Sequence, residues 1–147
     1  MIINNQGGNK MKISDYIQDI TGIIGGFVGW FLGGFDIFLI LLTVFVVIDY
    51  VSGVIAATCN GKLSSSVGFK GIAKKVFIFF LVGMAHILDI SVLGQGAMLR
   101  TAVIFFYAAN EGLSIIENCA LMNLPVPEVL KKALAKLSTS ADKKDEN

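Results

Sequence analysis

Charged side chains are scarce in this sequence, and their scarcity indicates the class of protein. Only 16% of the 147 residues are Asp, Glu, Lys or Arg, whereas 54% are hydrophobic and the mean hydropathy is +0.73. A soluble domain of this length cannot usually bury so much apolar surface, so the composition predicts a membrane protein. The net charge of +1 excludes a nucleic-acid-binding protein that depends on a broad basic field.

Histidine and cysteine are nearly absent, which excludes most catalytic and metal sites. With one histidine, His86, the chain has no HExxH pair, no plausible catalytic triad and no set of metal ligands. We therefore expect no enzymatic activity, no cofactor and no metal. The two cysteines, Cys59 and Cys119, are 60 residues apart in apolar surroundings, and we interpret them as buried thiols.

Long apolar segments dominate the rest of the chain. The first of them has 23 residues with one ionisable group, which at about 1.5 Å per residue suffices to cross a hydrocarbon core of about 30 Å. The segments that we predict to cross the membrane are 37–59, 76–93 and 101–122. The sequence therefore predicts an all-α, multi-pass integral membrane protein. We divide it into a polar segment, a glycine-rich helix, a membrane domain and a tail, at residues 1–12, 13–34, 37–122 and 123–147.

The placement of lysine predicts how these segments are oriented. The loop expected at residues 60–75 has four lysines and no acid, and Lys and Arg accumulate in cytoplasmic loops. We therefore expect this loop to be cytoplasmic and the connection at 94–100, which has only Arg100, to be outside. The tail and the C-terminus then return to the cytoplasm.

The glycine-rich segment 13–34 has bulky apolar residues on one helical face and glycines on the other. Glycines four residues apart form the small-xxx-small pattern by which membrane helices approach closely. With one glycine of the next segment, the candidates for helix packing are Gly22, Gly25, Gly26, Gly29, Gly33 and Gly53.

Two interpretations of this segment stay open. A fourth membrane helix, which we prefer, would place Lys10 and Lys12 in the cytoplasm and would make an outer hairpin turn at Gly33, Gly34 and Asp36. The alternative is an amphipathic helix that lies on the membrane surface.

Ionisable groups inside the apolar segments are candidates for function. These candidate buried or pore-lining residues are Asp49, His86, Asp89, Glu111 and Glu117. An ionised side chain that faces lipid costs about 2.5–3.5 kcal/mol on insertion scales, so these groups must face one another, a partner subunit or water. His86 and Asp89 are three residues apart and could form a hydrogen bond. Hydration near the cytoplasmic interface is the alternative for Asp49 and Glu117.

The tail combines a predicted helix with a charged end. Pro125 and Glu128 suit the start of a helix, where the helix dipole favours an acid. Its basic face, suited to an anionic membrane surface, consists of Lys131, Lys132 and Lys136. A solvated charged helix end is the alternative, and the last ten residues, STSADKKDEN, are predicted to be disordered.

Three stretches resemble a known family in their order and spacing. They are IDYVSG at 48–53, SSSVGFKGIAKK at 64–75 and NEGLSIIENCALMNLPVPEVLKKAL at 110–134. Together they resemble small phage holins of Gram-positive systems, a family that also includes clostridial toxin-secretion holins. The matching residues of the second stretch, which we assign to the cytoplasmic loop, are Ser65, Ser66, Gly68, Gly71, Lys74 and Lys75.

The resemblance implies a homo-oligomer of the bacterial cytoplasmic membrane that opens lesions for a cell-wall hydrolase (endolysin) or a toxin. Its partners would be the lipid bilayer and other copies, and the released protein would not bind stably. The rival hypotheses are a small ion or solute channel subunit and a regulatory, antiholin-like membrane protein. The resemblance also suggests paired translation starts at Met1 and Met11.

Overall fold

The computed structural model describes residues 13–94 and 96–142, and these residues form five helices and no strand. The helices are α1 (Ile13–Phe31), α2 (Ile37–Cys59), α3 (Ser65–Ser91), α4 (Met98–Leu121) and α5 (Glu128–Asp142). The predicted all-α class is confirmed. The polar segment 1–12, with Lys10, Lys12 and both candidate starts, lies outside the described residues, as do residues 143–147.

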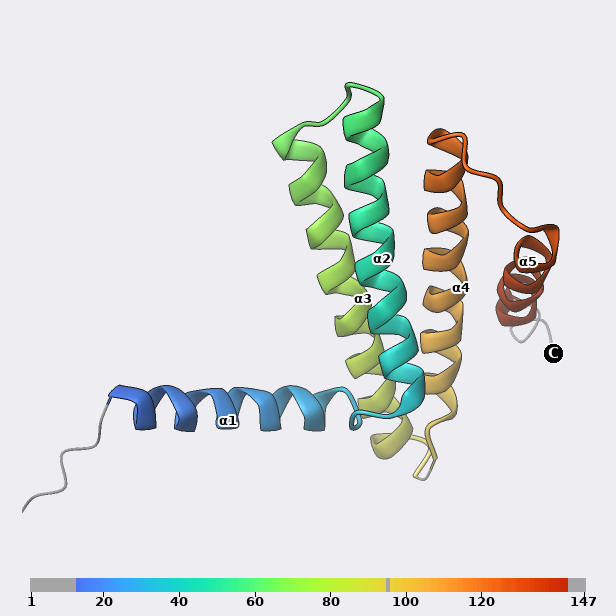
Figure 1. Ribbon diagram of the computed structural model, residues 1–147. Helices are drawn as coiled ribbons and strands as arrows, with labels where there is room; N and C mark the ends of the chain where they lie inside the picture. The colour runs from blue at the N-terminus through green and yellow to red at the C-terminus, as the bar shows by residue number, and fades with distance from the viewer. Residues whose placement is uncertain (1–12, 95, 143–147) are drawn as a thin grey trace, which may run out of the picture.

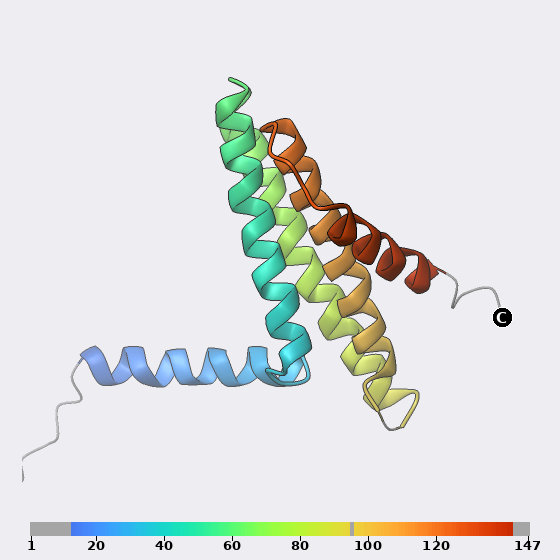
Figure 2. The same ribbon diagram turned by 45° about the vertical axis from the view of Figure 1, so that its right-hand side comes forward.

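The body of the molecule is a bundle of α2, α3 and α4, which stand side by side (Figures 1 and 2). Each of these helices is long and apolar enough to cross a membrane, over Ile37–Cys59, Gly68–Ser91 and Met98–Leu121. Many large apolar side chains on the outside of α2 and α3 are exposed, as expected of surfaces that face lipid. The expectation of three membrane-crossing helices is therefore confirmed by length and composition.

The predicted loop at 60–75 is wrong beyond residue 64, because α3 begins at Ser65. The two glycines that suggested a loop lie instead where α3 approaches α2. A Cβ atom at Gly68 or Gly71 would lie 3.7 Å from the Tyr50 side chain. Ser65 and the following residues assigned to the loop, Lys74 and Lys75 included, are therefore helical.

The apolar core lies inside this bundle and at the corner with α1. Its buried residues are Leu32, Leu39, Leu42, Val46, Ile78, Val82, Ile104 and Ala108. Two glycines that the sequence did not single out allow close packing here. Gly83 lies directly against Phe31, and a Cβ at Gly112 would lie 2.7 Å from Leu134 of α5. A larger side chain at either position would require the Phe31 or Leu134 side chain to move.

Helix α1 projects sideways from one end of the bundle and does not run alongside it (Figure 1). None of its residues is buried, and it is not among the three candidate spans. The structure therefore gives no support to the preferred interpretation of a fourth membrane helix, and both interpretations stay predictions. Two acids and four glycines lower the hydropathy of α1. After the helix the chain turns a corner at Gly33 and Gly34, whose φ values of +78° and +91° glycine adopts readily.

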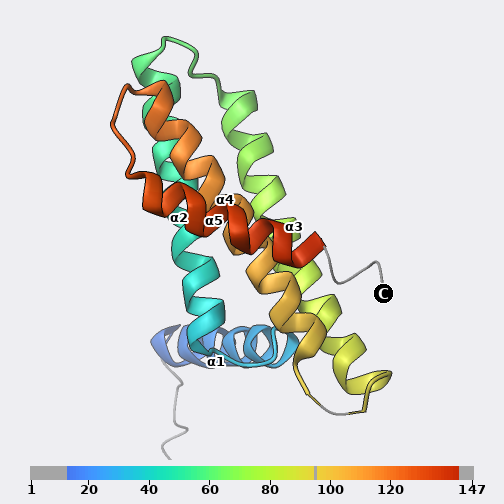
Figure 3. The same cartoon turned by 90° about the vertical axis from the view of Figure 1, so that its right-hand side faces the viewer.

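Helix α5 packs against α4 (Figure 3). Leu134 supplies the buried contact, because Gly112 leaves room for it. The predicted helix is thus confirmed, but it continues to Asp142, so residues 138–142 are helical where disorder was predicted. Both cysteines are free, and Cys59 is exposed where α2 ends, so its predicted burial is wrong.

Candidate functional site

Three charged side chains meet where the three long helices face one another. Lys75 of α3 lies with its Nζ 2.6 Å from Oδ2 of Asp49 on α2 and also pairs with the carboxylate of Glu111 on α4. The side chains are only 14%, 12% and 10% exposed, in the order Lys75, Asp49, Glu111. We call these residues the central triad. Because each comes from a different helix, the triad ties all three candidate spans together.

Hydrogen bonds between α2 and α4 complete the surroundings of Asp49. Asn118 donates from Nδ2 to Oδ1 of Asp49 at 3.0 Å and to Oγ of Ser52 at 2.9 Å. Gly53 lies beside this contact, and a Cβ there would be in ordinary van der Waals contact with Asn118, at 3.5 Å. In the part of the chain that the structure describes, no buried side-chain nitrogen or oxygen lacks a partner. The polar groups of the bundle are therefore satisfied within one subunit.

A second polar cluster lies at the end of the bundle beside α1. Arg100, only 2% exposed, donates from Nε to the Leu32 carbonyl at 2.5 Å and from Nη2 to the Gly34 carbonyl at 3.0 Å. Its Nη1 donates to Oδ2 of Asp36 at 2.6 Å. Asp36 also accepts from the Leu39 amide at 2.8 Å and caps α2. Arg100 therefore fastens the corner between α1 and α2 to the start of α4.

The charge of Arg100 changes the titration of its partner. The hydrogen bond from Arg100 holds the pKa of Asp36 below its ordinary value, although partial burial acts in the opposite direction. Asp36 lies just before the membrane segment that α2 forms. Its carboxylate is thus kept ionised under acidic conditions by the folded corner.

Asp89 has a structural partner that the sequence did not reveal. It is fully buried, and its two oxygens accept from the backbone amides of Leu99 at 3.0 Å and Arg100 at 2.9 Å. These amides lie in the first turn of α4, so Asp89 caps that helix from α3. Among the described residues no hydrogen bond joins Asp89 to His86, which instead lies near Gly33, where a Cβ would be 2.7 Å from its Nδ1.

The structure thus divides the predicted buried polar residues into separate groups. Asp49 and Glu111 meet in the central triad, whereas His86 and Asp89 lie at the opposite end of α3. Glu117 is exposed on α4, so the expectation of a buried group is wrong there and hydration is the better interpretation.

The sequence did not predict the two cations that pair with acids inside the fold. It places Lys75 in a loop and Arg100 in a short connection. A signal was present in the sequence, since each is close in the chain to an apolar segment and buried acids require cationic partners.

The small-residue face of α1 contacts little within the subunit. A Cβ at Gly22, Gly25 or Gly26 would meet no atom within 4 Å, and one at Gly29 would lie 3.1 Å from Phe35. This face is therefore open in a single subunit. Its use in helix packing between copies stays a prediction.

Comparisons with known proteins agree with this architecture. A family model described as the bacteriophage holin family matches residues 26–139. An uncharacterized protein of Listeria monocytogenes is 48% identical over 110 residues, which cover 75% of this chain and 78% of the relative. An uncharacterized protein of Clostridium perfringens is 42% identical over 128 residues, or 86% and 96% of the two chains. A probable holin of Bacillus phage phi105 is 34% identical over 109 residues, or 74% and 80%. No solved structure matches the chain.

Proposed function

This chain belongs to the bacteriophage holin family, whose members are not enzymes, and on that premise we propose that several copies assemble into a lesion in the bacterial cytoplasmic membrane. A cell-wall hydrolase or a toxin crosses through the lesion without binding the chain stably. The observation that carries the proposal is the central triad, which places three ionisable groups inside apolar helices. Such groups are costly beside lipid and are tolerated where they pair or line water.

In the closed subunit the triad keeps its charges away from lipid. One ammonium faces two carboxylates, and Asn118 donates to the second oxygen of Asp49. The outer surfaces of the bundle are apolar. A closed subunit can therefore accumulate in the bilayer without exposing charge.

Opening would follow from separation of α3 from the other two helices. Helix α2 packs much more extensively on α4 than on α3, so α3 is the helix that α2 releases most readily. Separation would take Lys75 away and leave Asp49 and Glu111 facing the gap. Two uncompensated carboxylates need water, and a ring of copies around a water-filled lesion supplies it.

The orientation that we propose follows the lysines. The end of the bundle with Lys62, Lys70 and Lys74 lies in the cytoplasm, and the connection from α4 to α5 at residues 122–127 returns there. Helix α1 then lies in the outer interface, with its bulky apolar face toward lipid and Asp15 and Asp19 toward water.

The function is tested by inducing the chain in a bacterium that also makes a cytoplasmic wall hydrolase without an export signal. We expect abrupt lysis that requires both proteins, with hydrolase activity released at the same moment. Loss of membrane potential without hydrolase release would replace the proposal with an ion or solute channel. No effect of the chain alone, but delayed lysis by another holin, would instead show a regulatory partner.

The open glycine face of α1 leads to a second prediction, which concerns assembly of the subunits. Gly26→Leu should abolish the large oligomers and delay lysis several-fold, because a bulky side chain prevents close helix approach. Gly26→Ala is the matched control and should keep both, since alanine and leucine improve helix propensity similarly over glycine. The size of the detergent-solubilised protein, measured by mass photometry, checks this result. Equal oligomers in both variants would remove α1 from the assembly interface.

A further inference from the structure

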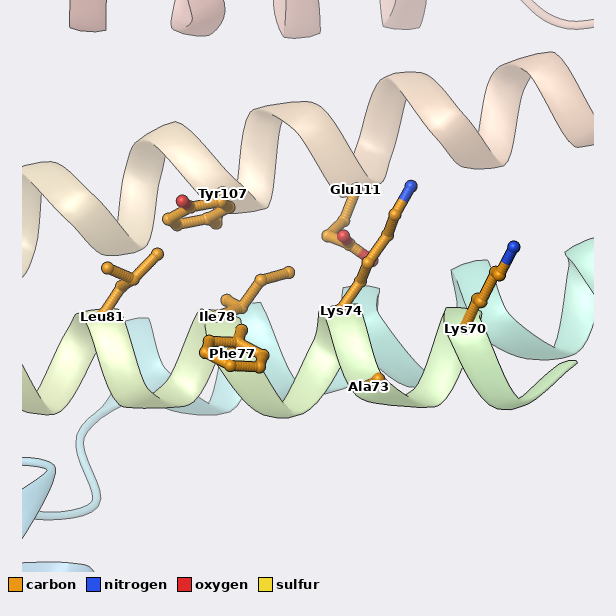
Figure 4. Close-up of a pocket in the computed structure, with 8 residues that line it drawn as sticks. All are labelled: Lys70, Ala73, Lys74, Phe77, Ile78, Leu81, Tyr107 and Glu111. Carbon is orange, nitrogen blue, oxygen red and sulfur yellow. The ribbon is translucent and has the colours of Figure 1, made fainter. Parts of the chain in front are cut away.

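A hollow of about 600 Å³ lies between α3 and α4, within the size range of small-molecule sites (Figure 4). Most of its lining comes from one face of α3, with two residues from α4. The lining residues are Lys70, Ala73, Lys74, Phe77, Ile78, Leu81, Tyr107 and Glu111. None of these residues has a role in the lesion mechanism except Glu111. The hollow therefore requires an explanation of its own.

The lining changes from cationic to apolar along α3. Lys70 and Lys74 are one helical turn apart on the same face, both exposed, and neither is in an ion pair with another described residue. Beyond them the lining is apolar, with Phe77, Ile78 and Leu81 on α3. Two cations that lead into an apolar trough match a ligand with an anionic head and a hydrocarbon chain.

The length of the trough also suits such a ligand. The eleven helical steps from Lys70 to Leu81 correspond to about 17 Å of helix. This is close to half of a hydrocarbon core of about 30 Å, which is the depth of one leaflet. Because α3 is a candidate membrane span, the trough runs from one membrane interface toward the midplane.

The single acid in the lining does not oppose an anionic ligand. Glu111 shares Lys75 with Asp49, so the triad has at most one negative charge in excess, and Lys70 and Lys74 outnumber it. Figure 4 shows Lys70 and Lys74 reaching from α3 toward α4 on the same side as the apolar residues. The net charge at the mouth of the hollow is thus positive.

From these observations we propose that the hollow between α3 and α4 binds one anionic phospholipid. Its phosphate lies between Lys70 and Lys74, and one acyl chain lies along Phe77, Ile78 and Leu81. Basic pockets between membrane helices are suited to anionic head groups. The lipid site depends on the membrane span of α3 and not on lesion formation. Failure of the lysis test would therefore not contradict the lipid site, and absence of lipid binding would not contradict the proposed function.

The test uses the full chain in nanodiscs that contain equal amounts of phosphatidylglycerol and phosphatidylcholine. After transfer to mild detergent, native mass spectrometry counts the lipid that each subunit retains. We expect one phosphatidylglycerol per subunit and no retained phosphatidylcholine. The double variant Lys70→Gln/Lys74→Gln should bind phosphatidylglycerol about 30-fold more weakly, as expected for the loss of two lysines near a head group.

Matched variants separate the site from general surface charge. Lys62→Glu changes the net charge equally outside the hollow and should leave binding unchanged. Leu81→Trp fills the apolar part, keeps both lysines and should also lose the lipid. The exposed lysine substitutions remove no buried contact, so they test the site even if Leu81→Trp lowers the unfolding temperature.

Several outcomes would overturn the proposal. They are equal retention of both lipids by the natural chain, unchanged binding in the Lys70/Lys74 double variant, or displacement of the lipid by glycerol phosphate, which would show a free-phosphate site. Lipid-free dimers cross-linked through this face would show that a second copy fills the hollow instead.

Discussion

Replacing Lys75 with methionine should lower the free energy of unfolding by about 3–5 kcal/mol, the usual cost of removing one partner of a buried ion pair. The substitution keeps the length of the side chain but removes the only ammonium of the central triad. Asp49 and Glu111, which Lys75 now separates, would then face each other without compensation. Unfolding of the detergent-solubilised chain by heat or denaturant measures the loss.

The Lys75→Met substitution should also make lesions open earlier. Because the triad closes the three spans on one another, the Lys75→Met chain should collapse the membrane potential earlier after induction than the natural chain. Lys62→Met is the control, since Lys62 is an exposed lysine outside both the triad and the hollow, and it should change neither stability nor onset.

A double variant distinguishes lost charge balance from lost packing. Adding Glu111→Gln to Lys75→Met removes one of the opposed carboxylates and should restore part of the stability. If the double variant is as unstable as the single one, the triad does not act through charge and the closed-state mechanism is wrong.

Replacing Arg100 with alanine should also lower stability by about 3–5 kcal/mol, because it removes a buried charged partner. It would leave the Leu32 and Gly34 carbonyls and the Asp36 carboxylate without their donor. The corner between α1 and α2 should then detach from α4, and limited proteolysis should cut the chain near residues 32–36 faster.

Arg100→Lys should not rescue this loss, because an ammonium on a flexible stem cannot donate in the three fixed directions of a guanidinium. Lys62→Ala, at an exposed cation elsewhere, controls for the change in net charge. If Arg100→Lys restored the unfolding temperature, the corner would need only a positive charge.

The same cluster predicts a pH dependence. The folded pKa of Asp36 is below its unfolded value, so its contribution to stability is present above about pH 4 and is lost as the pH falls through the folded pKa. Asp36→Asn should remove this part of the acid loss, and Arg100→Ala should reduce it. An unchanged acid transition in both variants would show that Asp36 does not couple to Arg100.

The sequence predicted those features that depend on residues close to one another in the chain. Apolar runs of sufficient length predicted the three candidate spans, and the proline, early acid and amphipathic spacing predicted α5. The prediction of a loop at residues 60–75 is wrong beyond residue 64, since glycine and serine in the first turns of α3 are typical of a loop. Whether Gly68 and Gly71 end a helix or allow one to approach Tyr50 depends on a neighbouring helix.

The sequence likewise predicted one part of the candidate site and not the other. The cost of a charge in lipid required partners for Asp49 and Glu111, but nothing in their spacing identified Lys75, which is 26 and 36 residues away from them in the chain. The proposed pairing of His86 with Asp89 used proximity along one helix. The start of α4 offered Asp89 two backbone amides, and these are its partners in the fold.

By itself the sequence determined that the protein is helical, crosses a membrane and must satisfy several acids away from lipid, because hydropathy, length and desolvation cost are properties of each segment. Only the tertiary structure decided which cation meets which acid, that α1 projects sideways from the bundle, and that a basic-to-apolar trough runs between α3 and α4. These features arise where separate helices come together, and contacts between distant segments leave no periodic pattern along the chain.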